Sequence, residues 1–364
     1  MMLIFPLSFT NHHYHEGSDL SKRRVTLKDI AHRANVSAQT VSRVMNNSPE
    51  VSVETRQRIR DLALEMGYHP NIIARSLVTH QTGTIGVMVS SLDYYGPNFL
   101  LVGIEEEART LGYSLTLSIL PEPRTADIEL SLRSLLDRQV DGILWVVPEI
   151  AENYNWWDVN TPGVLDVPIV FMERQPGEDY SVVSCDYRYG GRLATHHLLE
   201  NGCRNVAIIT ANLDVWEGSE RYAGWRDALL DAGIQPTDRQ VYQGNWFPKS
   251  GYNGLLQLQN QFPEMDGLFV CADHMALGVL QAAAENNIDI PGELPIVGFD
   301  DWSETAYYHP ALTTIHKPFK EIGGLAMREL HRQIITDTVE LQKDPPKTIL
   351  MRPYLVVRKS CGTG

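Results

Sequence analysis

The sequence predicts an α/β protein that begins with a small all-α domain and continues as a larger core of parallel sheets. Segments between residues 26 and 66 show helical apolar spacing and helix-capping residues. From Thr84 onward, short apolar runs alternate with helical segments, which is typical of parallel sheets covered on both faces. Its 364 residues are enough for two or three domains, each with its own core.

The charge is distributed unevenly along the chain. Residues 21–80 contain ten Lys or Arg and five Asp or Glu, whereas residues 81–364 contain 21 and 38. A basic segment attached to an acidic body indicates that only the segment meets a polyanion, because the body repels phosphate. Chance fluctuation would give the same counts, so the charge alone does not decide the function.

Residues 1–24 are expected to form a disordered N-terminal extension. Their apolar start, M-M-L-I-F-P-L-S-F, is too short to span a bilayer and lacks the basic start of a secretion signal. The four cysteines show no C-x-x-C pair and no metal-ligand spacing, which favours reduced, buried thiols in a cytosolic protein. We therefore predict no metal site and no cofactor.

The first two helices are predicted from their caps. Thr26 and Asp29 fit a capping box that opens a helix over residues 27–34, and Asn35 tolerates the positive φ of a tight turn. Ser37 then caps a second helix, in which Val41 and Val44 point inward. Together they predict a helix-turn-helix.

A third helix follows directly. Ser52 caps a helical segment over residues 54–66, which Gly67 ends and Pro70 stops.

The outward face of the second helix suits base recognition. Gln39 and Arg43 lie four residues apart on this face, beside Ala38 and Ser42. Gln pairs bidentately with adenine and Arg with guanine, each good pair giving about 1–3 kcal/mol of discrimination. The side chains expected to contact phosphate are Thr26, Ser37, Thr40, Ser42, Asn46 and Ser48. An ordinary helical hairpin with a polar face is the alternative.

The run V-T-L-K-D-I-A-H-R-A-N-V-S-A-Q-T-V-S-R-V-M-N, with V-S-V-E-T-R and G-Y-H-P-N-I-I-A-R-S-L after it, closely resembles the DNA-binding head of the lactose repressor family. The resemblance implies a head over residues 25–69 and a hinge helix and linker over residues 70–82. It places Asn71 at the start of the hinge, Ala74 in the minor groove, Leu77 as the wedge that kinks the site, and Arg75 beside it. Asn35 and Ala38 depart from the family's usual residues. One head makes few base contacts, so we expect a homodimer on a palindromic operator.

The core is expected to contain buried strands separated by helices. Apolar runs lie at residues 84–90, 113–119, 141–147, 167–172, 205–210, 267–272 and 294–300, and residues 99–112 and 190–202 show helical patterns that end at Gly. Because such folds bind ligands at the carboxyl ends of their strands, the loops after these runs are where a site is expected.

This part also resembles the family's effector-binding core, which is similar to periplasmic sugar-binding proteins. The resemblance is strongest in S-E-R-Y-A-G-W-R-D-A-L, D-H-M-A-L-G, I-V-G-F-D-D and H-P-A-L-T-T-I. It implies an effector core over residues 83–359 with two lobes and three crossings. One lobe would take about 83–185 and 318–345, and the other about 186–313 and 346–359.

The resemblance also implies ligand-binding residues in the cleft between the lobes. Arg221 and Asp300 match the positions that grip sugar hydroxyls, Trp246 matches a stacking aromatic, and Glu173 matches an acidic position. Asp273 is a further candidate. Ala272 stands where an Asn is common, and His274 could compensate.

Four more candidates rest on local sequence alone. Tyr95 and Asn98 follow the first strand, Trp157 follows the third, and Trp302 adjoins Asp300. For each aromatic residue, a packing role is the alternative to ligand contact.

These residues favour a DNA-binding repressor with a small carbohydrate effector, with a purine or nucleoside corepressor as the alternative. A sugar receptor for transport would need an export signal and no head. Glycoside hydrolysis by Glu173, Asp273 and Asp300 is a third class, but no other catalytic motif supports an enzyme. Turnover of a glycoside would distinguish it from a sensor.

Overall fold

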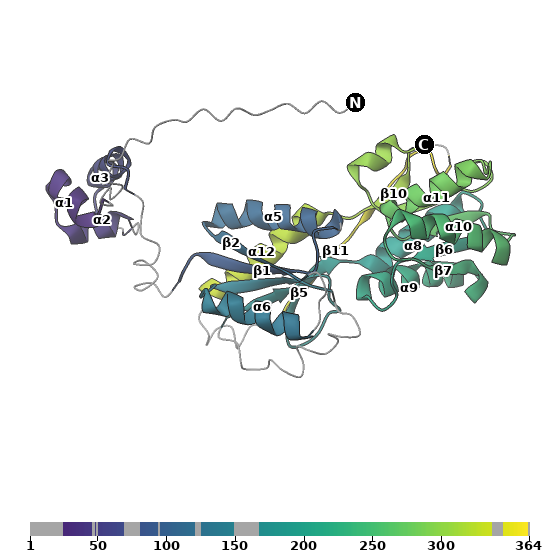
Figure 1. Cartoon of the computed structure of the whole chain (residues 1–364), viewed down its shortest axis with the longest axis horizontal. Helices are drawn as coiled ribbons and strands as arrows, with labels where there is room; N and C mark the ends of the chain where they lie inside the picture. Colours follow the sequence, from purple (N-terminus) through teal and green to yellow (C-terminus); the bar gives the residue numbers. More distant parts are fainter. Residues whose placement is uncertain are drawn as a thin grey trace, which may run out of the picture. The chain divides into compact units, whose positions relative to one another are not determined.

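The chain forms two compact units in this computed structural model, one within residues 1–80 and one within residues 81–364 (Figure 1). The structure describes residues 25–45, 48, 50–68, 81–93, 95–120, 125–148, 167–336 and 345–362. The predicted extension, residues 1–24, lies outside this range. So does the predicted hinge helix, residues 71–77.

The first unit is the predicted all-α head. It contains α1 (Leu27–Ala34), α2 (Ala38–Met45) and α3 (Val53–Glu65). Ile30, Val41, Val44 and Ile59 are fully buried between the three helices. The apolar spacing of each helix therefore turns one stripe toward a shared core, as the sequence predicts.

Local signals define where the head's helices begin. Thr26 and Asp29 form the predicted capping box, and Ser52 caps α3 through the N–H of Thr55. Asn35 ends α1 with a φ of 52°, which a short amide side chain tolerates better than most. The chain therefore turns within three residues and starts α2, completing the helix-turn-helix.

The first lobe of the core is built on a six-stranded sheet in the order β11-β5-β4-β3-β1-β2. All of its strand pairs are parallel. Its strands are β1 (Thr84–Val89), β2 (Ser114–Ile119), β3 (Gly142–Val146), β4 (Ile169–Phe171), β5 (Ser181–Cys185) and β11 (Thr348–Met351).

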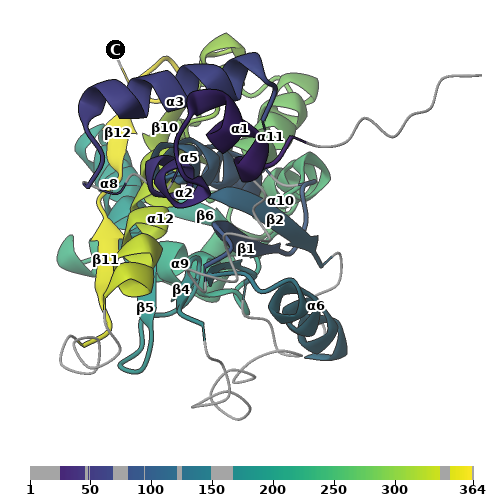
Figure 2. The ribbon, with the colours of Figure 1, turned by 90° about the vertical axis from the view of Figure 1, so that its left-hand side faces the viewer.

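Helices cover both faces of this sheet, because successive side chains of a strand point to opposite faces. Val87 packs into the cluster that includes α5 (Tyr95–Leu111) and α12 (Phe319–Ile335), whereas Met88 packs into the cluster that includes α6 (Thr125–Asp137). Figure 2 shows α5 and α12 on one side of β1 and α6 on the other.

The second lobe repeats this plan. Its sheet has the order β12-β10-β9-β8-β6-β7, parallel except for the antiparallel pair of β10 and β12. Its strands are β6 (Val206–Thr210), β7 (Val241–Gln243), β8 (Gly267–Val270), β9 (Ile296–Asp300), β10 (Thr313–His316) and β12 (Tyr354–Val356).

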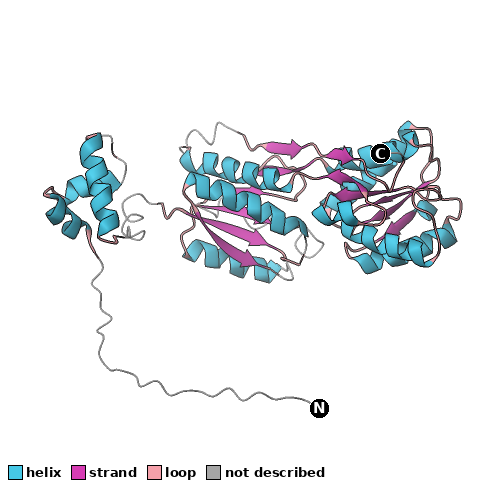
Figure 3. Ribbon diagram, turned by 90° about the horizontal axis from the view of Figure 1, so that it is seen from above, coloured by secondary structure: helices cyan, strands magenta, loops and turns pink. Residues whose placement is uncertain are grey.

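The helices of the second lobe pack in pairs. α8 (Tyr187–Glu200) packs on α9 (Trp216–Asp231), and α10 (Pro248–Gln261) packs on α11 (Asp273–Glu285). Short 3-10 turns, η1 (Asp238–Gln240) and η2 (Ser303–Tyr307), connect elements of this lobe. Figure 3 shows the two sheets side by side, with helices around each.

The chain crosses between the lobes three times, from β5 to α8, from β10 to α12 and from β11 to β12. The last crossing differs from the predicted boundary, which assigns residues 346–359 to the second lobe. Thr348–Met351 instead pairs with β5 in the first sheet. Arg352 and Pro353 then separate β11 from β12, and Pro353 has no N–H to continue a ladder.

Three general features of the described residues bear on function. None of their helices is both long enough and apolar enough to cross a bilayer. Their His, Cys, Asp and Glu side chains form no group of three or more that could hold a metal ion. All four cysteines are buried free thiols, as the sequence predicts.

Candidate functional site

The exposed face of α2 carries two side chains that can hydrogen-bond to bases. Gln39 and Arg43 are exposed, whereas Val41 and Val44 on the opposite side are buried. Nε of Arg43 lies 3.1 Å from Oε2 of Glu50. Arg43 is therefore held by an exposed carboxylate, and because exposed ion pairs are weak, a bidentate contact with a guanine edge could replace it.

The hydroxyl groups at the helix starts are engaged in capping. Thr26 Oγ1 donates to Oδ2 of Asp29 at 2.7 Å, and Ser37 Oγ accepts the N–H of Thr40 at 3.0 Å. Ala38 and Ser42 are half-buried beside the exposed residues of α2. These contacts orient the amino-terminal ends of α1 and α2.

Several head residues predicted to contact DNA lie outside the described residues. They are Asn46, Asn71, Ala74, Arg75 and Leu77.

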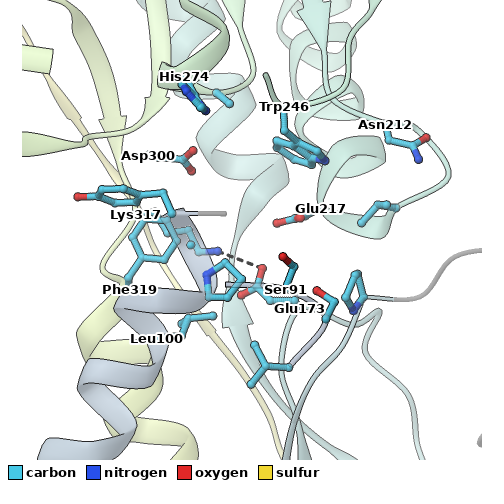
Figure 4. A pocket seen from close by; sticks show the side chains of 18 of the residues that line it. Ser91, Leu100, Glu173, Asn212, Glu217, Trp246, His274, Asp300, Lys317 and Phe319 are labelled. Carbon is cyan, nitrogen blue, oxygen red and sulfur yellow. Dashed lines mark hydrogen bonds and ion pairs between the residues drawn. The ribbon is translucent and has the colours of Figure 1, made fainter. Parts of the chain in front are cut away.

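The core contains a cleft of about 330 Å³ that is lined from both lobes (Figure 4). Glu173 follows β4 of the first lobe, Asp300 ends β9 of the second, and Lys317 lies where the chain crosses from β10 to α12. The cleft thus lies at the carboxyl ends of the strands, where parallel sheets place ligand sites.

Arg221 is the central cation of the second-lobe wall. It is 1% exposed, and its guanidinium packs 4.0 Å from the ring centroid of Phe299. Its Nη2 lies 3.4 Å from Oδ1 of Asp300 and 3.7 Å from Oε2 of Glu217, and Nη1 donates to the carbonyl of Cys271. Burial disfavours the charge, but Asp300 and Glu217 raise the pKa of Arg221 above its usual value.

Asp300 combines burial with an uncommon backbone conformation. Its φ is 115°, which side chains rarely adopt, and its residue is 8% exposed. Burial raises the pKa of its carboxyl to about 6, although Arg221 and Lys317 act against that rise. The residue is therefore held so that its carboxyl reaches the cleft.

Glu173, Lys317 and Tyr187 form a second charged cluster. Nζ of Lys317 donates to Oε2 of Glu173 at 3.0 Å and to the hydroxyl of Tyr187 at 2.6 Å, and this hydroxyl donates to the same carboxylate. Burial would raise the pKa of Glu173, but the Lys317 charge and hydrogen bonds with Tyr187, Lys317 and Glu217 lower it below its usual value. Glu173 is therefore an ionised carboxylate at neutral pH.

Glu217, which sequence reasoning misses, faces this cluster from α9. Burial and then the negative charge of Glu173 raise the pKa of its carboxyl to about 7. Its place four residues before Arg221 is a local signal that could have revealed it, because residues at this spacing share a helix face. Lys317 is also missed, since the strand before it, β10, has no long apolar run.

Aromatic rings form the remaining walls. Tyr95 stacks on Trp302 with ring centroids 4.2 Å apart and on Phe99 at the same distance. His274 packs against Trp302 at 4.8 Å. Trp246 lines the cleft with Arg221 5.1 Å from its ring centroid.

Seven of the ten residues predicted to bind ligand line this cleft. They are Tyr95, Glu173, Arg221, Trp246, His274, Asp300 and Trp302.

Asn98 and Asp273 are predicted to bind ligand but do not line the cleft. Nδ2 of Asn98 donates to the carbonyl of Leu92 at 3.0 Å, so this amide closes its own loop. Asp273 is fully buried and accepts the N–H of Trp302 at 3.0 Å and the hydroxyl of Thr314 at 2.6 Å. Asp273 therefore positions Trp302. The tenth residue, Trp157, lies outside the described residues.

Comparison with protein families matches both units. Residues 26–71 match the model of bacterial regulatory proteins of the lacI family, and residues 195–361 match a periplasmic binding protein-like domain. The repressor PurR of Actinobacillus pleuropneumoniae serotype 3 (strain JL03) is 32% identical over 92% of this chain and 98% of its own length.

Similar solved structures support the same family assignment. The Lac repressor dimer bound to operator and the anti-inducer ONPF covers 93% of this chain and 99% of its own, with 29% identity and a TM-score of 0.79. The complex of the transcriptional regulator CelR with cellobiose covers 93% and 100%, with 28% identity and a TM-score of 0.69. This protein therefore belongs to the lacI family of bacterial regulatory proteins and is a non-enzymatic, DNA-binding transcriptional regulator.

Proposed function

We propose that this regulator is a repressor that binds a palindromic operator as a homodimer and responds to a small carbohydrate held in the cleft of its core. The observation that best supports this proposal is the set of charged side chains that line the cleft. Carboxylates of Glu173, Glu217 and Asp300 stand beside the cations Arg221 and Lys317. A sugar hydroxyl both donates to a carboxylate and accepts from a cation, so a polyol can satisfy both kinds of group.

The aromatic rings support the same ligand class. Trp246 can stack on the apolar face of a pyranose, and Tyr95 with Trp302 forms a second apolar wall. Nε1 of Trp302 is a buried donor without a partner among the described residues, as is Nε of Arg221. Buried donors of this kind favour a ligand that carries oxygen acceptors.

The head would read DNA through α2 in the major groove. Gln39 and Arg43 would contact base edges, while Thr26, Ser37, Thr40, Ser42 and Asn46 would contact phosphates. The hinge, Asn71 to Leu77, would enter the minor groove. There Ala74 would fit the floor, Leu77 would wedge into a base step, and Arg75 would lie beside it.

The coupling between cleft and DNA would work through the lobes. Glu173 belongs to the first lobe, Arg221 and Glu217 belong to the second, and Lys317 lies on a crossing between them. A ligand that bridges these groups would change the angle between lobes and so the spacing of the two hinges in a dimer. A coupling free energy of about 1–3 kcal/mol is enough to change operator occupancy.

A purine or nucleoside corepressor is the second candidate, because the 32% identical relative is a repressor named PurR. A flat base could stack on Trp246 and pair its edge with Asp300. The cellobiose complex of CelR favours the sugar instead.

The deciding experiment begins by selecting the operator from random duplex DNA with the full-length protein. Its affinity is then measured with and without mono- and disaccharides, and with and without adenine, guanine and hypoxanthine. A saccharide that weakens operator binding supports the proposal, whereas a purine that strengthens it supports the corepressor.

A further inference from the structure

The cleft contains more acid than base among its described lining residues. Three carboxylates, from Glu173, Glu217 and Asp300, meet two cations, Arg221 and Lys317. The remaining titratable lining residues, His274 and Tyr95, add no positive charge at neutral pH, because burial lowers the pKa of His274 and raises that of Tyr95. With every carboxylate ionised, the cleft holds one negative charge without a cation of its own.

Each of the two cations already lies beside a carboxylate of the cleft. Lys317 lies 3.0 Å from Glu173 and donates to Tyr187 as well. Arg221 is shared, because Asp300 is 3.4 Å and Glu217 is 3.7 Å from the same nitrogen. The longer of these distances leaves Glu217 as the acid with the weakest partner in the cleft.

A second observation identifies where a ligand donor is needed. Oε1 of Glu173 is buried and accepts from no N–H or hydroxyl group of the described residues, although Oε2 of the same carboxylate is bound twice. The carboxyl of Glu217 is the remaining side chain that hydrogen-bonds to Glu173. Glu173 is 7% exposed and lines the cleft. Only the proton of Glu217 can therefore serve this buried carboxylate oxygen as a donor, so a ligand that displaces this proton is expected to supply an N–H of its own here.

Glu173 and Glu217 act on each other across this position. Burial, the charge of Glu173 and the hydrogen bond between the two side chains raise the pKa of Glu217 to about 7, so Glu217 binds a proton near neutral pH. Figure 4 shows Glu217 on the wall that carries Trp246, and Glu173 on the wall that carries Lys317. A positive group between the two carboxylates would replace that proton.

We propose that the effector carries a primary ammonium group, as an amino sugar does, and that Glu173 and Glu217 bind this group from the two lobes. The inference rests on the proposed carbohydrate-binding function and names the ligand class within it. A divalent cation is the other positive group to consider. The described acidic side chains, however, do not form a group that could hold a metal ion.

The contact would also serve the regulatory coupling. Glu173 follows β4 and Glu217 lies on α9, so an ammonium between them ties one lobe to the other. The attraction between opposite charges is larger in a site shielded from water than on the surface, and both residues line the cleft and are largely buried. A neutral hydroxyl at the same position could satisfy only one carboxylate as a donor.

The test compares matched sugars by isothermal titration calorimetry on the full-length protein at pH 7. Glucose, galactose, mannose and cellobiose are each paired with an amino derivative and its N-acetylated form. The inference expects at least one amine to bind about tenfold tighter or more than both its hydroxyl and N-acetyl counterparts, which is about 1.4 kcal/mol.

Two variants test whether Glu217 causes the preference for the amine. Glu217→Gln should reduce the amine preference to about twofold or less, since the amide keeps the shape and removes the charge. Glu220→Gln, one turn further along α9 and outside the cleft lining, is the matched control and should retain it. Thermal unfolding of both variants checks that they fold.

The outcomes separate the two proposals. If hydroxyl or N-acetyl sugars bind as tightly as every amine, or if both variants lose the preference equally, the ammonium inference is overturned while carbohydrate binding stands. If no sugar of any pair binds, the inference falls, and binding of adenine, guanine or hypoxanthine in the same assay would overturn the carbohydrate function too.

Discussion

Arg43 and Glu50 form an exposed ion pair in the head, with Nε of the arginine 3.1 Å from Oε2 of the glutamate and their side chains 46% and 61% exposed. An exposed pair of this kind contributes about 0–1 kcal/mol. A bidentate contact between Arg and guanine gives about 1–3 kcal/mol of discrimination. Because the contact with guanine is worth more than the exposed ion pair, we expect Arg43 to leave Glu50 when DNA is bound.

The first prediction concerns this exchange. Glu50→Gln should change the free energy of unfolding by less than about 0.5 kcal/mol. It should strengthen operator binding about two- to fivefold, because it frees Arg43 and removes a negative charge near phosphate. Fluorescence anisotropy on labelled operator at fixed salt measures both specific and non-specific affinity. Weaker binding by Glu50→Gln would show that Glu50 positions Arg43 instead of competing for it.

Arg43→Ala provides the matched measurement. It should lower operator affinity and relax the preference at one base position in each half-site, by about 1–3 kcal/mol. A repeat of the operator selection with this variant reads out that position directly. An unchanged selected sequence would exclude Arg43 from base recognition.

Much of the head could be predicted from sequence because its signals are local. The capping box of Thr26 and Asp29 spans four residues, and the turn at Asn35 depends on the conformational range of a single residue. Interactions of such short range depend only on residues that are neighbours in the chain. The bounds of α1 therefore follow from the sequence alone.

The cleft could be predicted only in part, because its geometry depends on contacts between distant residues. Asp273 follows strand β8, as a ligand-binding residue would, but its carboxyl group is used by Thr314 and the backbone of Trp302. Thr348–Met351 joins the first sheet only through β5. No local sequence pattern predicts the hydrogen bonds of Asp273 or the pairing of Thr348–Met351 with β5, because both depend on how the sheets assemble.

A second prediction tests Asp273 as the residue that positions Trp302. Burial and the charge of Asp300 raise the pKa of Asp273 well above its usual value. Asp273→Asn should therefore be tolerated, with a loss of about 1 kcal/mol or less, since the amide can accept from Trp302 and donate to Thr314. Asp273→Ala should cost about 2–4 kcal/mol, because it leaves both donors unsatisfied.

Urea unfolding followed by tryptophan fluorescence measures the two variants side by side. Ligand affinity should fall with Asp273→Ala and be largely retained with Asp273→Asn. Equal stability of the two variants would show that the hydrogen bonds of Asp273 are not what holds this part of the core.

A third prediction concerns the close approach of α5 and α12. A Cβ added at Gly103 would lie 2.0 Å from the carbonyl oxygen of Lys320, so the helices would have to separate. Gly103→Ala should lower the free energy of unfolding by about 3 kcal/mol, at the upper end of overpacking costs.

Gly324→Ala is the matched control on the same pair of helices. The nearest atom to its added Cβ would be Nη1 of Arg328 at 3.5 Å, an ordinary contact. This variant should be neutral or more stable by about 0.5–1 kcal/mol, because Ala loses less backbone entropy than Gly in a helix. Similar destabilisation of both variants would contradict the packing account.

The last prediction is the pH dependence of stability that Glu217 causes. Its pKa is about 7 in the folded protein, against an ordinary value of 4.5. Between these values the folded state binds the proton and the unfolded state does not, so the free energy of unfolding falls as pH rises from about 4.5 to 7. Glu217→Gln should remove this contribution, on the order of 1–3 kcal/mol, and should leave that of Asp300. Urea unfolding of wild type and variant at pH 5 and pH 7.5 gives the difference: the variant should lose less stability over this range. An equal or steeper loss in the variant would mean that Glu217 is ionised in the folded core throughout, and that Arg221 compensates its charge without a ligand.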